Sequence, residues 1–166
     1  MAVTVSEIYN IIDKIAPFEK RFEYDNVGIL VGDPSATVTR IAVCLDITRD
    51  VVKRAIENDC DLIVSHHPVI FDKLSSVTSE SVVYMLVKNG ISAICAHTNL
   101  DCATGGVNDR LASALGLSDV EKIADYKAPN EPEMARIGTI KSTEPIEFAK
   151  FVKEQLRTQI CNQKIC

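Results

Sequence analysis

The sequence lacks the features that would place it in a membrane, in an export pathway or on nucleic acid. No apolar stretch is long enough to span a bilayer, and residues 1–7 have neither the basic nor the apolar region of a signal peptide. Lys and Arg number 18 against 23 Asp and Glu, with no basic run, so general nucleic-acid binding is not expected. These absences favour a cytoplasmic globular protein.

The six cysteines indicate neither disulfides nor a thiolate metal site. Cys44 and Cys95 lie inside predicted core strands, and Cys60 comes directly before another. Without an export signal, reduced thiols are expected. The absence of any C-x-x-C pair argues against zinc bound by thiolates. Cys161 and Cys166 lie in the tail and form no recognisable motif.

The hydrophobic pattern predicts an α/β fold. The chain of 166 residues is 46% hydrophobic and 25% charged, an ordinary balance for a globular domain. Bounded apolar runs predict strands at 27–31, 39–47, 61–65 and 91–96. Helical spacing predicts a helix behind the capping box Thr4–Glu7, one capped by Thr48, and others at 79–88 and 107–115. This alternation is typical of a mainly parallel sheet flanked by helices.

The pattern weakens after residue 117. Residues 118–132 are expected to form a loop or boundary because they contain two prolines and other turn-forming residues. A strand is predicted at 135–140 and an amphipathic helix at 145–156, whose buried side would hold Ile146, Phe148, Ala149, Val152 and Leu156. We therefore expect an α/β lobe over residues 1–117 and, over 118–166, a linker plus the start of a following region.

All three histidines of the chain lie where predicted strands end. His66 and His67 close the apolar run 61–65, while His97 follows the run 91–96 and precedes Asp101. Open parallel sheets bind ligands beyond the carboxyl ends of their strands, so these side chains are expected to form one site. Imidazole and carboxylate groups together suit a divalent ion, and Zn, Fe, Mn, Co and Ni all fit.

The adjacent histidines leave two arrangements open. Neighbouring side chains on a regular strand point to opposite faces, so His66 and His67 should not share one ion if the strand continues through them. Either one is a ligand and the other a core or supporting residue, or each binds a different ion of a pair that a carboxylate such as Asp101 bridges. His97 is then a third ligand or a residue that orients the others.

Three more polar residues stand near predicted strand ends. Asp25 and Asn26 precede the strand at 27–31, and Asp46 ends the strand at 39–47. Each has an ordinary structural explanation, a turn for the first two and a helix-start partner of Thr48 for the third. A contact with substrate, or support of the metal ligands, is the functional alternative for all three.

Five segments of the chain, taken together, resemble a known family. They are YDNVGILVGD at 24–33, LDIT at 45–48, SHHPVIF at 65–71, AHTNLD at 96–101 and GGVND at 105–109. In this order they are similar to the motifs of the GTP cyclohydrolase 1 type 2 homologues, also called Nif-three-like or dinuclear metal centre hexameric proteins. The resemblance covers residues 4–117.

This resemblance implies a fold of two related α/β lobes, assembly as a homohexamer, and two divalent ions in a cleft between the lobes. His66, His67 and Asp101 match family ligands, with the two histidines on different ions, and His97 would support them. GTP ring-opening hydrolysis is named for some members. The resemblance therefore implies a metal-dependent hydrolase acting on a nucleotide or another small molecule.

The chain departs from the family in one respect. Members complete the site with a His-x-x-x-Glu motif from the second lobe, and no histidine follows His97 here. We therefore expect a fragment, a truncated product, or a chain whose partner supplies the missing half. The alternative function is a non-catalytic assembly or interaction module that keeps partial metal ligands; a single-ion nucleotide-binding domain is a further alternative.

Overall fold

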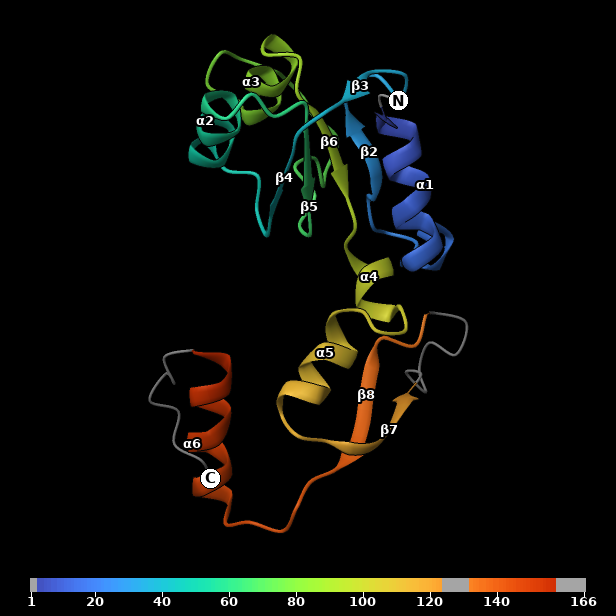
Figure 1. Cartoon of the computed structure of the whole chain (residues 1–166), viewed down its shortest axis with the longest axis vertical. Coiled ribbons are helices and arrows are strands. Elements are labelled where there is room, and N and C mark those ends of the chain that lie inside the picture. Colours follow the sequence, from blue (N-terminus) through green and yellow to red (C-terminus); the bar gives the residue numbers. More distant parts are fainter. Residues whose placement is uncertain (1–2, 124–131, 158–166) are drawn as a thin grey trace. The chain divides into compact units, whose positions relative to one another are not determined.

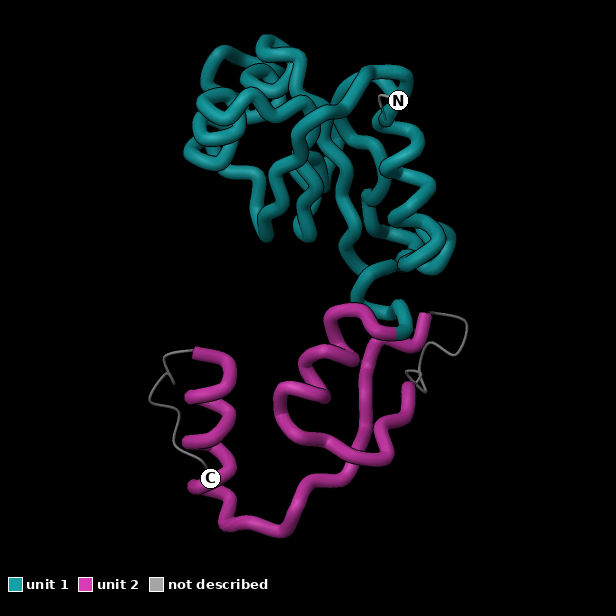
Figure 2. Tube along the Cα trace, in the orientation of Figure 1, with its two compact units in different colours: residues 1–104 teal, residues 105–166 magenta. Residues whose placement is uncertain are grey.

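The chain folds into two compact units, Met1–Thr104 and Gly105–Cys166 (Figure 2). The computed structural model describes residues 3–123 and 132–157 (Figure 1). Cys161, Cys166 and the part of the expected loop at 124–131 lie outside the described residues. The predicted lobe boundary at residue 117 stays a prediction.

The first unit is built on a four-stranded sheet with the strand order β2-β6-β5-β4. Strands β4 (Ile41–Cys44), β5 (Leu62–Ser65) and β6 (Ser92–Cys95) are parallel neighbours, and β2 (Gly28–Val31) pairs antiparallel with β6. The predicted mainly parallel α/β sheet is confirmed. A small antiparallel pair, β1 (Val3–Thr4) with β3 (Thr37–Val38), stands beside it.

The three parallel strands are paired in register. Cys44 lies opposite Ser65, and Ser65 lies opposite Cys95. Because these are the last residues of β4, β5 and β6, the chain leaves all three strands along one row. Residues that follow these strands therefore gather at one edge of the sheet.

Two helices cover one face of the sheet (Figure 1). They are α2 (Arg49–Glu57) and α3 (Val82–Lys88), and both present their apolar sides to the strands. Val52 of α2 and Leu86 of α3 are fully buried and pack in one cluster with Ile63 of β5. The alternation of apolar residues along these segments is what made both helices predictable.

The other face of the sheet is covered by α1 (Val5–Ile15) and the short helix η1 (Phe18–Lys20). Val5 packs with Leu62 of β5 and Ile94 of β6, and all three are fully buried. Apolar side chains thus alternate along β5 between the two clusters, as expected for a strand covered on both faces.

Helix starts follow the predicted caps. The Thr4 side chain accepts a hydrogen bond from the Glu7 N–H, and the Glu7 carboxylate accepts one from the Thr4 N–H. This reciprocal pair confirms the predicted capping box at the start of α1. Thr48 caps α2 by accepting from the Val51 N–H, also as predicted.

A short helix that the sequence pattern did not predict follows β6. Helix α4 (Thr98–Cys102) begins directly after His97 and carries Asp101. The sequence predicts no helix or strand between the strand at 91–96 and Gly105–Gly106. Among the described residues, Cys44, Cys60 and Cys95 are free thiols.

The second unit contains α5 (Val107–Ala114), β7 (Ser118–Ile123), β8 (Ala135–Thr139) and α6 (Pro145–Leu156). Strand β7 corrects the expectation of a loop from residue 118, because residues 118–123 pair antiparallel with β8. Every residue of β7 is exposed, so this strand carries no buried apolar run that would have marked it.

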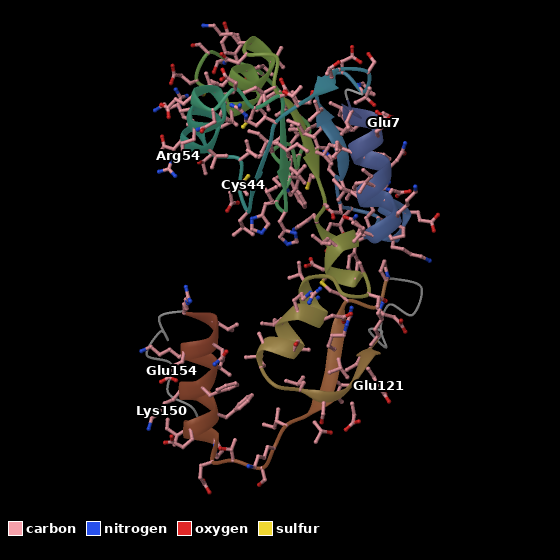
Figure 3. The ribbon with its side chains drawn as sticks, in the orientation of Figure 1. Glu7, Cys44, Arg54, Glu121, Lys150 and Glu154 are labelled. Atoms are coloured by element: carbon pink, nitrogen blue, oxygen red, sulfur yellow. The ribbon has the colours of Figure 1, made fainter. Side chains whose placement is uncertain are left out.

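Helix α6 has the predicted bounds, yet its predicted buried side is not buried. None of its residues is buried among the described part of the chain, and Ile146 and Leu156 are exposed. Its charged residues Lys150 and Glu154 are labelled in Figure 3. Amphipathic spacing identified the helix, but spacing alone does not supply an element that covers it.

The GGVND segment is explained within the second unit. Asp109 accepts a hydrogen bond of 2.6 Å from the Gly105 N–H and forms an ion pair with Arg136 of β8. The Asn108 amide donates to the Met134 carbonyl at 2.9 Å. The hydrogen bond from Arg136, together with that from Gly105, holds the pKa of Asp109 below its ordinary value. These contacts join the start of α5 to β8.

In the part of the chain that the structure describes, no helix has the length and apolar character needed to cross a bilayer.

The core of the first unit should depend strongly on Leu62, which is fully buried. We expect Leu62→Ala to lower the free energy of unfolding by about 2–5 kcal/mol, because it removes buried methyl groups and leaves a cavity. Leu74→Ala, in an exposed loop position, is the matched control and should change stability by less than about 0.5 kcal/mol. Urea denaturation followed by circular dichroism measures both, and equal losses would contradict the packing described.

Candidate metal centre

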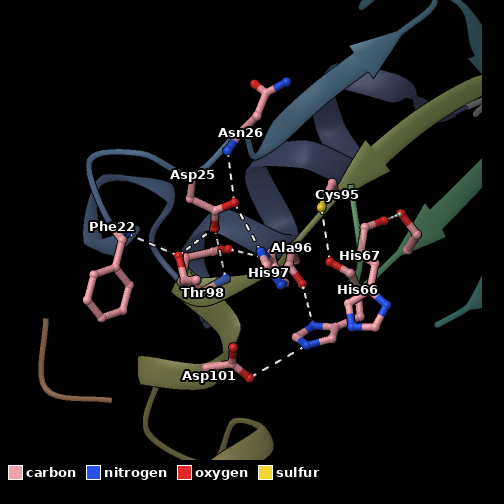
Figure 4. Close-up of polar contacts among 12 residues, drawn as sticks. Phe22, Asp25, Asn26, His66, His67, Cys95, Ala96, His97, Thr98 and Asp101 are labelled. Atoms are coloured by element: carbon pink, nitrogen blue, oxygen red, sulfur yellow. Dashed lines mark hydrogen bonds and ion pairs between the residues drawn. The ribbon is translucent and has the colours of Figure 1, made fainter. Parts of the chain in front are cut away.

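The three histidines meet at the edge where the parallel strands end. Strand β5 stops at Ser65, so His66 and His67 lie beyond it, and His97 is the residue before α4. One possible ligand nitrogen from each of His66, His67 and His97 lies within 4.8 Å of the others. Since β5 does not continue through His66 and His67, the rule that neighbouring strand residues point to opposite faces does not apply to them. Their ring centroids are 5.1 Å apart (Figure 4).

His66 is oriented by a backbone carbonyl. Its Nδ1 lies 3.0 Å from the oxygen of Ala96, and a carbonyl can only accept, so Nδ1 carries the proton. In the neutral ring, Nε2 then has a free lone pair. It lies 3.6 Å from Asp101 Oδ1, too far for a hydrogen bond. Two atoms bound to one tetrahedral ion lie about 3.3 Å apart, so this spacing suits a shared cation.

His67 is oriented by a carboxylate. Its Nδ1 lies 2.7 Å from Oδ1 of Asp46. Asp46 is the residue predicted to end the strand before α2. An ionised carboxylate only accepts, so Nδ1 is again the donor and Nε2 is left available. The side chains of His67 and Asp46 are 44% and 56% exposed, which makes this the solvent-facing side of the cluster.

His97 is oriented by a buried carboxylate. Its Nδ1 lies 3.0 Å from Asp25 Oδ1, and the Asp25 side chain is completely buried. The N–H and the hydroxyl of Thr98 donate to Asp25 Oδ2 at 3.1 Å and 2.5 Å, and the Asn26 N–H donates to Oδ1 at 2.8 Å (Figure 4). These donors replace the water that an ionised carboxylate loses on burial.

The protonation of Asp25 follows from two opposing effects. Burial raises its pKa, but the hydrogen bonds from Thr98 and His97 together lower it more, so the pKa of Asp25 lies below its ordinary value. The carboxylate is therefore ionised and acts as an acceptor for the His97 ring. Nearby, burial and the charge of Asp25 raise the pKa of the Cys95 thiol to about 12, against a smaller lowering by Ser65.

The donor set fits a divalent cation. Metal-binding histidines usually donate their second ring N–H to a carboxylate or a backbone carbonyl, which fixes the tautomer and the ring orientation. All three histidines follow this rule, with Ala96, Asp46 and Asp25 as acceptors. Asp101 adds a half-buried carboxylate next to His66. Imidazole and carboxylate ligands suit Zn, Fe, Mn, Co and Ni.

Asn26 lies differently from the other predicted site residues. Its amide donates to the Ile70 carbonyl at 2.6 Å, and in Figure 4 its side chain points away from the three imidazoles. It ties the segment after His67 to the start of β2. A direct contact with substrate by Asn26 stays a prediction, and its visible role is to hold this segment.

Sequence reasoning missed two residues that position the site. Thr98 holds Asp25 and also accepts a hydrogen bond of 3.1 Å from the Phe22 N–H. Asn99 accepts from the His97 N–H at 2.9 Å and donates to the Ala16 carbonyl at 2.7 Å. Both belong to the AHTNLD segment, yet Phe22, Asp25 and Ala16, to which they bond, lie more than 70 residues away in sequence, where no local pattern points to them.

The family model for Duf34/NIF3 (NGG1p interacting factor 3) matches residues 3–164. The chain belongs to the Duf34/NIF3 family. This confirms the family that the five segments predicted.

Curated relatives of this Duf34/NIF3 chain include two named GTP cyclohydrolase 1 type 2 homolog. The protein from Clostridium acetobutylicum is 34% identical over 165 residues, which is 96% of this chain and 62% of the relative. The protein from Clostridium perfringens is 37% identical over 160 residues, 92% of this chain and 60% of the relative. The chain thus spans about three fifths of the length of these relatives.

Solved structures resemble the chain as well. Reduced HcgD from Methanocaldococcus jannaschii is 29% identical with a TM-score of 0.81, over 93% of this chain and 60% of HcgD. Staphylococcus aureus protein SA1388 is 35% identical with a TM-score of 0.70, over 74% of this chain and 36% of that protein. Both agree with the α/β fold described above.

The lowered pKa of Asp25 gives a pH dependence with a definite sign. A carboxylate whose folded-state pKa lies below its ordinary value of 3.8 stabilises the fold above that value. That contribution is lost as the pH falls through the folded-state pKa. We therefore expect Asp25→Asn to destabilise the chain most above about pH 5, with a difference from wild type that shrinks below about pH 4.

Urea unfolding from pH 2 to 7 measures this difference, with Asp72→Asn in the exposed loop as the matched control. A gap between wild type and Asp25→Asn that is constant over this range would show that Asp25 is not ionised as described.

Proposed function

We propose that this chain binds divalent metal ions through His66, His67 and Asp101 and belongs to a metal-dependent hydrolase. The observation that carries the proposal is the common orientation of the imidazoles. Each Nδ1 is engaged by an acceptor, which leaves Nε2 as the nitrogen available to a cation. This is the arrangement that metal-binding histidines usually show, with the second ring nitrogen donating to a carboxylate or a backbone carbonyl.

We propose two ions for the complete site, as the family resemblance implies, with the paired histidines on different ions. Two features of the described residues support this. His66 and His67 are held by separate acceptors, Ala96 after β6 and Asp46 after β4, and their side chains are 18% and 44% exposed, respectively. His97 supports the pair, and its membership in the same cluster makes it a further candidate ligand.

When bound, such ions act as Lewis acids and bring the pKa of water towards neutrality. The chain's own groups prepare for this by fixing the ligands. The Ala96 carbonyl holds His66, Asp46 holds His67 and Asp25 holds His97. Because Asp46 is more than half exposed, it is the acceptor within reach of solvent, and we assign to it a second role as a contact for substrate.

The substrate class is proposed from the relatives. Their name, GTP cyclohydrolase 1 type 2 homolog, points to a nucleotide, and another small molecule is the alternative. We further propose a homohexamer, as the resemblance implies, and a cytoplasmic location. Since the chain spans about three fifths of these relatives, activity of the whole protein depends on more than the residues described.

The alternative is a non-catalytic assembly module, and one surface favours it. Among the residues that the structure describes, β4 pairs with β5 alone and its other edge has no strand beside it; Val43 of β4 is 81% exposed. Ile41 and Leu45, two residues away on either side, are exposed as well. An exposed apolar row at a sheet edge is typical of a surface that another element covers.

Metal analysis tests the ligand assignment. The purified wild-type chain should bind Zn²⁺, Mn²⁺ or Co²⁺, and His66→Ala, His67→Ala and Asp101→Asn should each weaken binding at least about tenfold. Asp72→Asn is the matched carboxylate control and should leave the affinity unchanged. Calorimetric titration and elemental analysis measure this; a wild-type chain that binds no divalent ion would exclude the proposed function.

Turnover separates the hydrolase from the assembly module. If the chain is a hydrolase, the metal-loaded protein should consume GTP or another nucleotide, and both a chelator and Asp101→Asn should abolish the reaction. Chromatography of the nucleotide measures it, with size-exclusion chromatography of the same samples. Stable oligomers that bind the ion but show no metal-dependent turnover would favour the assembly module.

A further inference from the structure

The backbone carbonyls of His66 and His67 accept hydrogen bonds from two buried side chains. The Ser65 hydroxyl donates to the His67 carbonyl at 2.8 Å, and the Cys95 thiol donates to the His66 carbonyl at 3.0 Å (Figure 4). Ser65 is the last residue of β5 and Cys95 the last residue of β6, and both are buried. Ser65 lies directly before His66, and Cys95 lies two residues before His97.

The backbone N–H groups of His66 and His67 donate to backbone carbonyls at the end of β4. The His66 N–H donates to the Cys44 carbonyl at 3.2 Å, and the His67 N–H donates to the Leu45 carbonyl at 2.9 Å. The backbone N–H and the backbone carbonyl of each histidine are therefore both hydrogen-bonded. The two bonds from the N–H groups have backbone acceptors and do not depend on the side chains of Cys44 and Leu45. The two bonds to the carbonyls depend on the identity of Ser65 and Cys95.

These carbonyl bonds control where the imidazoles point. The direction of a Cα–Cβ bond is set by the backbone on either side of it, and for His66 and His67 that backbone has left the regular strand. Without a ladder partner, the carbonyls would turn towards other donors or water. A shift of about 1 Å in a ligand is enough to spoil a site of this kind.

We propose that Ser65 and Cys95 are positioning residues of the metal centre. Their O–H and S–H groups fix the His66–His67 peptide groups and thereby the directions in which the two Nε2 atoms face. Neither side chain touches the ion. The predicted effect on ion affinity rests on the metal function proposed above, whereas the effect on the histidine rings does not.

The test uses two disruptive variants, one rescue and two controls. Ser65→Ala and Cys95→Ala remove the donors, and Cys95→Ser restores a donor of nearly the same size. Ser92→Ala removes an equally buried hydroxyl at the other end of β6. Cys44→Ala removes a thiol from the same row, at the end of β4 labelled in Figure 3, and keeps its backbone bond to His66.

Two readouts separate positioning from general stability. Long-range ¹H–¹⁵N NMR of the metal-free chain reports the tautomer of each ring, and wild type should show Nδ1–H for His66 and His67. Ser65→Ala and Cys95→Ala should convert these signals to tautomer mixtures, while His97, which is held by Asp25, stays unchanged as an internal reference. Zn²⁺ titration should show affinity lowered about 10–100-fold in both variants and restored in Cys95→Ser.

Unchanged tautomers and affinity in both disruptive variants would overturn the proposal. So would equal losses in Ser92→Ala and Cys44→Ala, because these would indicate a general effect on folding. Altered tautomers in a chain whose wild type binds no ion would support the positioning role and contradict the metal function. If Ser65→Ala does not fold, Cys95→Ala and its rescue decide the question alone.

Discussion

The in-register pairing of three parallel strands is the constraint on which the site depends. Strands β4, β5 and β6 end in one row, at Cys44, Ser65 and Cys95. Residues that follow these strands are therefore brought together although they are separated by stretches of chain that form α2 and α3. A slip of one residue in any pair would turn the side chains of that strand to the other face and separate the histidines.

Asp25 and Asp46, the two carboxylates that orient histidines of the site, differ in burial. Asp25 is completely buried and is kept ionised by hydrogen bonds from Thr98 and His97, so it gives His97 a fixed acceptor. Asp46 does the same for His67 from the solvent side. One carboxylate thus lies in the buried interior, and the other lies on the solvent-exposed side. Side chains fixed by packing and hydrogen bonds are what hold a binding site in its productive geometry.

Features that depend on residues close together in the sequence could be predicted, whereas features that depend on distant segments could not. The capping box at Thr4 and the apolar runs of β5 and β6 are local signals, and the structure confirms them. The strand-end position of the histidines predicted their convergence because parallel strands share an edge. Helix α4 was missed because it depends on Asp25, which reaches it from a distant segment.

The same reasoning explains the errors in the second unit. Strand β7 is exposed along its whole length, and its pairing with β8 is the interaction that defines it. Spacing identified α6 but could not show whether its apolar side is covered. His66 and His67 would point to opposite faces only on a regular strand, and β5 ends at Ser65, directly before them.

We propose that the histidines present Nε2 to divalent cations while Nδ1 is held by the protein. Anomalous diffraction from crystals of the cobalt-loaded chain tests it most directly. The account predicts cobalt within bonding distance of Nε2 of His66 and His67 and of Asp101, with Nδ1 of each ring still bonded to Ala96 or Asp46. Cobalt bound through Nδ1, or no cobalt beside these histidines, would contradict it.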